Sequence, residues 1–235
     1  MPVYKYKSFE DAEKALWNFN PDERYFEHLA ELYNFGNKLN PIEIPRGVFK
    51  FKTIEEANRH RERIELEHAK KRGAEILCEI RSIGMSGDGY DLVIPEPDGK
   101  GAEQSMRMAV DTGKIGLEEL NYINTHGTST PLGDVAEAKA VYRLVGGNED
   151  HLNVSSTKSV HGHLLGATGA VEAIICIEAI RRGVVPPSIN IDELDPEVPL
   201  SCINTSPVER EIGVAMSNSF GFGGHNSTVA FAKFA

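Results

Sequence analysis

From residue 74 onward, apolar positions alternate between helical spacing and strand-like runs. Apolar side chains recur every three or four residues in three segments, which predicts helices over 101–112, 134–144 and 161–182. Shorter apolar runs predict strands over 75–83, 122–124, 213–217 and 227–231. Glycine and proline between the first strand and the first of these helices predict a loop over 84–100. Strands and helices in alternation favour a layered α/β fold.

The predicted helix over 161–182 is apolar around nearly its whole circumference. Small residues at one end, Gly166, Ala167, Gly169 and Ala170, allow close approach of a neighbour. We expect such a helix to be buried between layers.

The first 64 residues have a different pattern. Apolar spacing predicts helices over 9–19 and 21–35, and alternation predicts a short strand over 47–52. Thr53 is expected to cap a charged helix that runs to about Arg72. Acidic and basic residues interleave along that helix, which favours a solvated surface with ion pairs over a nucleic-acid contact.

Composition changes near the same point. Eleven of the 18 aromatic residues lie within residues 1–64, whereas 20 of the 22 glycines follow them. Residues 1–72 hold 14 basic and 13 acidic residues, a net charge of +1, and the remainder carries a net charge of −11. These shifts predict two unrelated segments, 1–64 and 65–235. The total charge of −10 disfavours nonspecific nucleic-acid binding.

Several classes of protein are disfavoured by what the sequence contains. The longest apolar stretch, from Leu164 to Ile180, is interrupted by two glutamates, and the N-terminus has no apolar signal region, so neither a membrane span nor secretion is expected. Three cysteines without paired spacing argue against a disulfide framework or a cysteine metal site. A cytoplasmic protein is the expectation.

Three polar clusters follow the ends of predicted elements. The segments are 124–134, with His126, 154–167, with Lys158 and His163, and the glycine-rich 218–226. Two histidines and a lysine can stabilise a developing negative charge. Each cluster also has a purely structural alternative: the histidines could be core residues, Lys158 could be an exposed loop lysine, and the glycine-rich turn could only reverse the chain. Zinc bound by His161, His163 and His225 is disfavoured, because a spacing of two does not suit the predicted helix.

The clusters occur in the order found in one known family. INTHGTSTPLGD, SSTKSVHGHLLGATGAVEAI and SNSFGFGGHN closely resemble the C-terminal half of a β-ketoacyl-acyl carrier protein synthase of the elongating type, a thiolase-like condensing enzyme. The resemblance runs over residues 65–235. It implies the C-terminal half of a thiolase-like layered α/β fold, here preceded by a small, mainly helical, aromatic-rich segment of unknown role.

The resemblance also implies roles for matching residues. In that family, which serves fatty acid or polyketide synthesis, the positions of His126 and His163 bind the thioester carbonyl of malonyl-acyl carrier protein and stabilise the enolate left by decarboxylation. Lys158 would hold His163 in place electrostatically. The remaining matches are Thr128 and Thr130 for the pantetheine arm, Phe222 for the gate and an oxyanion-hole amide, and Glu172 as a supporting acid.

The family's nucleophile is a cysteine at a helix start in the N-terminal half. Cys78, Cys176 and Cys202 match no such position, and we predict that all three are buried structural thiols. The chain alone is therefore expected to form no acyl-enzyme and to catalyse no Claisen condensation. The resemblance implies neither metal nor cofactor, since substrates arrive on the phosphopantetheine of acyl carrier protein.

Two further interpretations remain open. The chain could be a noncatalytic module that binds acyl carrier protein or another partner, or a truncated fusion product. A condensing enzyme packs two similar halves around central helices, so a lone half should expose apolar surface. We therefore expect a homo-oligomer or a partner chain that carries the cysteine half.

Overall fold

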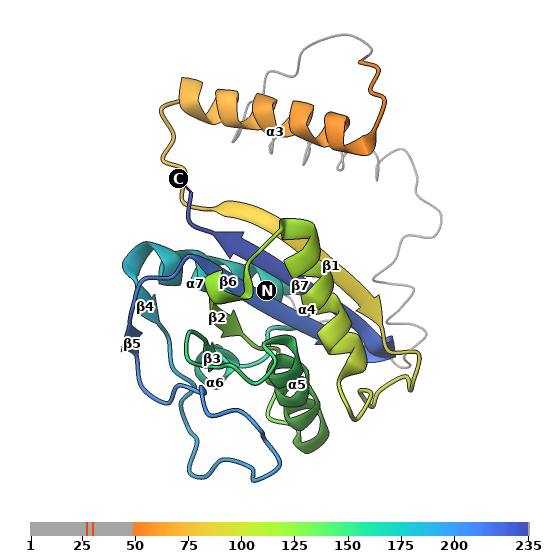
Figure 1. The fold of residues 1–235 in the computed structure, drawn as a ribbon, viewed down its shortest axis with the longest axis vertical. Coiled ribbons are helices and arrows are strands. Elements are labelled where there is room, and N and C mark those ends of the chain that lie inside the picture. The colour runs from red at the N-terminus through yellow and green to blue at the C-terminus, as the bar shows by residue number, and fades with distance from the viewer. Residues whose placement is uncertain (1–26, 28–29, 31–48, 235) are drawn as a thin grey trace. The chain divides into compact units, whose positions relative to one another are not determined.

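The computed structural model describes residues 27, 30 and 49–234 (Figure 1). The chain divides into two compact units, residues 1–75 and 76–235, and each is described by itself. The helices expected over 9–19 and 21–35 lie outside the described residues, apart from Glu27 and Ala30, which are helical. No described helix is long and apolar enough to cross a membrane.

The first unit contains the charged helix α3 (Ile54–Lys71). The Thr53 side chain accepts a hydrogen bond from the Glu56 amide at 3.3 Å, so the predicted cap is confirmed. The strand expected over 47–52 is wrong where it can be checked, because residues 49–52 form no strand. The rings of Phe49 and Phe51 instead contact the ring of His60, with centroids 4.7 and 5.2 Å apart.

A five-stranded sheet forms the centre of the second unit, in the order β1-β7-β6-β2-β3. Its strands are β1 (Glu79–Gly87), β2 (Leu120–Asn124), β3 (Asn153–Ser155), β6 (Val214–Gly221) and β7 (His225–Ala232). β2 runs parallel to β3 and β6, whereas β7 is antiparallel to both β6 and β1. A separate pair consists of β4 (Val184–Val185) and β5 (Val208–Glu209).

Helices cover both faces of this sheet. α4 (Lys100–Gly113) packs on β1 and β7 and contacts α5 (Pro131–Leu144), while α7 (Thr168–Arg182) packs on β6 and β7 from the other side (Figure 1). Successive residues of β6 serve the two faces, since Ala215 belongs to the α7 core and Met216 to the α4–α5 core. The predicted layered α/β arrangement is thus present.

The first strand lies four residues later than the pattern predicted. β1 includes Gly84 and Gly87, whereas the sequence pattern predicts a loop at both positions. Gly84 is buried beneath α4, where an added Cβ would overlap the carbonyl oxygen of Ser105. This glycine serves close helix packing and does not mark a turn.

Gly84→Ala is expected to lower the free energy of unfolding by about 3 kcal/mol, because helix and strand must separate to admit the methyl group. Urea denaturation measures this loss. Gly166→Ala is the matched control, since nothing lies within 4 Å of its added Cβ, and it should change stability by less than about 1 kcal/mol. An equal loss of unfolding free energy in the two variants would contradict the claim that α4 packs too closely on Gly84 to admit a side chain.

The helix expected over 161–182 is broken. α6 (Lys158–His161) ends at Gly162, whose φ of 72° suits glycine, and α7 begins only at Thr168 after a short 3-10 turn (Leu165–Ala167). Leu165 also has a positive φ, 52°, which interrupts any regular helix. His163 therefore lies in a turn, where contacts with neighbouring residues set the orientation of its ring.

α7 is not buried all round, contrary to the sequence expectation. Glu172, Cys176, Ala179 and Ile180 face the sheet, whereas Ile174 is 61% exposed. Ile83 and Met85 of β1 are also exposed. The predicted exposed apolar surface is therefore present in the described residues.

Candidate functional site

The three polar clusters meet because of the sheet topology. The parallel strands β2, β3 and β6 end at Asn124, Ser155 and Gly221, and each cluster begins at or near one of these ends. In open α/β sheets, sites form beyond the carboxyl ends of parallel strands. The sequence placed these residues at element ends, and the fold supplies the common edge.

Two histidines lie side by side at this edge. The rings of His126 and His163 have centroids 5.5 Å apart and an interplanar angle of 88°. The ring of Phe220, at the end of β6, lies 6.0 Å from His126. An anionic oxygen between the rings could accept a hydrogen bond from each imidazole.

His126 is held as a neutral imidazole. Desolvation, the largest cause, and the nearby Lys158 and His163 together lower its pKa to about 3. Its Nδ1 is buried and has no hydrogen-bond partner among the described residues. A neutral ring can donate one N–H toward the space beside His163.

Nuclear magnetic resonance should show no protonation of His126 between pH 8 and about 4. The expectation follows from its lowered pKa of about 3. Because the unfolded chain binds this proton first, the contribution of His126 to stability falls as pH drops from about 6.5 toward 3, by at most about 1.4 kcal/mol per pH unit. Ring resonances of His126 that titrate near pH 6.5 would contradict this environment.

The turn before α7 sets the tautomer of His163. The Leu165 amide donates to His163 Nδ1 at 3.2 Å, and Thr168 Oγ1 lies 3.1 Å from the same nitrogen. A backbone N–H can only donate, so Nδ1 carries no proton and the neutral ring is protonated at Nε2. The broken helix therefore has a chemical consequence, because a regular helix would not turn the Leu165 amide toward this ring.

Behind the histidines lies a buried ion pair. Lys158 Nζ donates to Glu172 Oε1 at 2.5 Å, and the two side chains are 3% and 0% exposed. The alternative of an exposed loop lysine is wrong. Burial raises the pKa of Glu172, against the opposing effect of Lys158, and Glu172 Oε2 has no partner among the described residues. Lys158 thus places a positive charge behind the site.

The remaining predicted contacts lie at the surface. Thr128 Oγ1 and Thr130 Oγ1 are 3.3 Å apart on the loop after His126. Phe222 is 78% exposed, in a turn where Gly223 donates its amide to Leu92 O at 2.7 Å. Phe220, which the sequence reading did not select, is the phenylalanine whose ring contacts His126.

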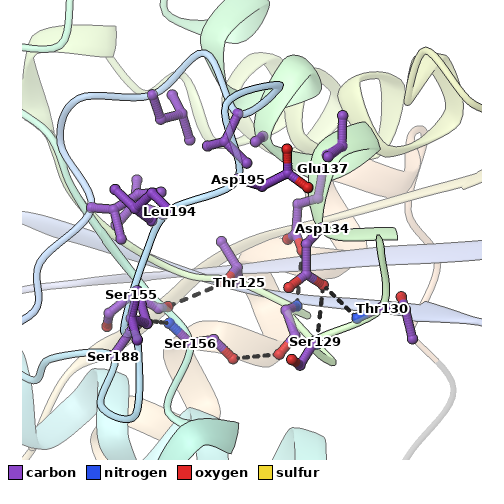
Figure 2. A pocket seen from close by; sticks show the side chains of 18 of the residues that line it. Thr125, Ser129, Thr130, Asp134, Glu137, Ser155, Ser156, Ser188, Leu194 and Asp195 are labelled. Atoms are coloured by element: carbon purple, nitrogen blue, oxygen red, sulfur yellow. Dashed lines mark hydrogen bonds between the residues drawn. The ribbon is translucent and has the colours of Figure 1, made fainter. Parts of the chain in front are cut away.

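A cavity of about 590 Å³ lies along the same loop (Figure 2). Thr125, Gly127, Thr130 and Asp134 line one side, and the loop over 188–203 supplies much of the other. Neither His126 nor His163 lines it. Desolvation raises the pKa of Asp134, although backbone amides of the loop oppose the effect.

Sequence reasoning missed a buried carboxylate beneath the loop. Glu137 of α5 accepts the amides of His126 and Gly127, each at 2.9 Å, and Asn218 Nδ2 at 3.0 Å. Burial raises its pKa to about 6. The available signal was a charged residue between two alanines, Ala136 and Ala138, on the predicted helix.

None of the three thiols is activated. Burial raises the pKa of Cys78 and Cys176, and it raises that of Cys202 to about 12. Cys176 is fully buried, whereas Cys78 and Cys202 are only partly so. Among the described residues, no group of three histidine, cysteine or acidic side chains could hold a metal ion.

Comparisons with known proteins identify the family of this part of the chain. Residues 77–192 match the family described as Beta-ketoacyl synthase, C-terminal domain. A 3-oxoacyl-(acyl-carrier-protein) synthase 2 of Staphylococcus aureus (strain COL) is 46% identical over 169 residues, covering 72% of this chain and 41% of that protein. The chain thus spans about two fifths of the length of that curated relative.

Solved structures give the same result. The ishigamide ketosynthase/chain length factor matches with a TM-score of 0.68 and 33% identity, over 72% of this chain and 41% of that one. A type II PKS acyl-carrier protein in complex with its ketosynthase matches with a TM-score of 0.68 and 30% identity, with the same coverage. The region that carries His126, Lys158 and His163 therefore belongs to the β-ketoacyl synthase family, as its C-terminal domain.

Proposed function

We propose that this chain supplies the malonyl-decarboxylating part of a β-ketoacyl synthase site. The observation that carries the proposal is the pair of imidazoles, 5.5 Å apart, one kept neutral by burial and the other protonated at Nε2. Such a pair offers two fixed donors to one thioester oxygen. The buried positive charge of Lys158 adds to the stabilisation of negative charge at that point.

The chemistry follows from where the electrons go. When the bond between the carboxylate carbon and the α-carbon of a malonyl thioester breaks, CO₂ leaves and the electron pair forms an enolate. His126 and His163 donate hydrogen bonds to the enolate oxygen. These hydrogen bonds stabilise the negative charge more strongly in a site without water than they would in water. The enolate then attacks an acyl thioester or, without one, takes a proton from solvent.

The acyl thioester is the part that this chain does not supply. A nucleophilic cysteine needs a lowered pKa, whereas burial raises the pKa of all three thiols here. We infer that the cysteine comes from elsewhere, and that the exposed apolar surface of α7 and β1 receives a second chain, either a cysteine-bearing half or a copy.

Partners follow from the same proposal. One similar solved structure is a complex of an acyl-carrier protein with its ketosynthase, and another pairs a ketosynthase with a chain length factor. We infer that acyl carrier protein brings the malonyl group on its phosphopantetheine arm, past Thr128, Thr130 and Phe222, in fatty acid or polyketide synthesis. The exposed positions of Thr130 and Phe222 suit contact with an incoming arm.

A second candidate is a noncatalytic module that pairs with a ketosynthase. The observation that favours it is the set of three thiols with raised pKa values, because a subunit that never carries an acyl group needs no activated cysteine. It differs from the first candidate in one respect, since it requires no turnover of a malonyl thioester.

Incubation of the purified chain with malonyl-pantetheine tests the proposal. Mass spectrometry should show conversion to acetyl-pantetheine, with no acyl group on Cys78, Cys176 or Cys202 when an acyl thioester is added. Condensation should appear only after a cysteine-bearing ketosynthase half is supplied. Binding without any acetyl product would favour the noncatalytic module, and an acylated cysteine would refute the assignment of the thiols.

A further inference from the structure

A third histidine, His161, lies beside the site, and the proposed function gives it no role. It is the last residue of α6, and Gly162 and His163 follow it directly. Its Nδ1 lies 2.7 Å from the carbonyl oxygen of Gly162, and its Nε2 lies 3.2 Å from Thr157 Oγ1. A carbonyl oxygen can only accept, so Nδ1 carries a proton and donates it. In the neutral ring Nε2 is then an acceptor, which is the opposite tautomer to that of His163.

The hydroxyl group of Thr157 extends this series of hydrogen bonds to another strand. Its one proton has two acceptors within reach, His161 Nε2 and Asn124 Oδ1, each at 3.2 Å. Asn124 Oδ1 already accepts the backbone amide of Thr157, whereas Nε2 has no other partner among the described residues, so the hydroxyl donates to the ring. Thr157 Oγ1 in turn accepts a hydrogen bond from Asn124 Nδ2 at 2.9 Å. A protonated ring would donate from Nε2, and the hydroxyl would then donate to Asn124 Oδ1, so the connection holds in either charge state.

The two ends of this series lie close to the two site histidines. Asn124 ends β2, two residues before His126, and both Asn124 and Thr157 are buried, so water does not compete for their bonds. At the other end, the Gly162 carbonyl belongs to the peptide group that leads into His163. The hydrogen bond from the ring restrains that peptide group just where the left-handed φ of Gly162, 72°, turns the chain.

We propose that His161 is a positioning residue, which ties the loop of His126 to the turn of His163 through Thr157 on one side and the Gly162 carbonyl on the other. What the two site imidazoles do at the spacing so fixed rests on the proposed function, but the link itself does not. A histidine that only capped a helix end would use one ring nitrogen for a terminal carbonyl. Here both nitrogens are engaged, and the second bonds to a side chain that is itself held by another strand.

Nuclear magnetic resonance of the ¹⁵N-labelled full chain tests the link without any activity. Long-range ¹H–¹⁵N spectra at pH 8 should show a proton on Nδ1 of His161 and on Nε2 of His163. His161→Phe keeps a ring but offers neither donor nor acceptor. It should therefore shift the side-chain amide signal of Asn124 and the backbone amide signal of His163.

Two conservative variants separate the two ends of the link. His161→Asn places an amide donor near the position of Nδ1, so it should return the His163 amide toward its wild-type shift and leave the Asn124 signal altered. His161→Gln places an acceptor near the position of Nε2 and should do the reverse. The matched control is His151→Phe, which changes a partly buried histidine between α5 and β3 and should shift neither signal.

The rate of malonyl-thioester decarboxylation is the second readout. His161→Phe should lower kcat about 10-fold with KM nearly unchanged, because displaced imidazoles stabilise the enolate less, and the Asn and Gln variants should each lose less. The proposal is overturned by a neutral His161 ring protonated at Nε2, by equal losses in all three variants, or by wild-type kcat in His161→Phe. If His161→Phe does not fold, the opposite shifts in the Asn and Gln variants decide. Amide signals that shift as expected in a chain that releases no CO₂ would refute the proposed function and leave the link standing.

Discussion

Lys158→Met lowers the free energy of unfolding by about 3 to 5 kcal/mol, because it leaves the carboxylate of Glu172 buried without its cation. Glu172 is 0% exposed and one of its oxygens already lacks a partner among the described residues. Urea denaturation at pH 8 measures the loss. A change below 1 kcal/mol would show that the pair is not buried as described.

The matched control removes both charges. Lys158→Met combined with Glu172→Gln should recover most of the lost stability, since no charge then remains buried. The single variant also has a defined pH dependence. The pKa of Glu172 in the folded chain is already raised, and it rises further without Lys158. The loss of stability in Lys158→Met is therefore largest at high pH, where Glu172 is charged, and it shrinks as pH falls through that pKa.

His126→Ala and His163→Ala each lower the rate of malonyl-thioester decarboxylation by about 100-fold or more, which is the effect of removing one donor from an oxyanion site. Both donors act on one oxygen, so the double variant should lose less than the product of the two single effects. His151→Ala is the control, because His151 lies on the chain between α5 and β3, outside the three clusters. Its rate should be unchanged.

Sequence periodicity predicted the elements that pack by an apolar stripe. The helices at 101–112 and 134–144 are observed as α4 and α5 with ends shifted by a few residues, and the last two strands are β6 and β7. The sequence also predicted that His126, Lys158 and His163 lie close to the ends of recognisable elements, although their common edge comes from the sheet topology. Local pattern carries such information because one face of each element must be buried.

Other features depend on contacts that leave no local trace. The sequence pattern predicts a loop at Gly84, although Gly84 is a strand residue where α4 approaches too closely for a side chain. The apolar pattern continues through 162–167, but positive φ values at Gly162 and Leu165 divert the chain and orient His163. Glu137 binds backbone amides, which have no identity in the sequence, so only the fold reveals its partners.

The rate of CO₂ release from malonyl-pantetheine, compared between the wild-type chain and the His126→Ala/His163→Ala double variant, tests the central claim most directly. The account predicts release by the wild-type chain at least about 100 times faster than by the double variant, without any acyl group on the protein. Equal rates in the two proteins would contradict the claim that these imidazoles form a decarboxylating site.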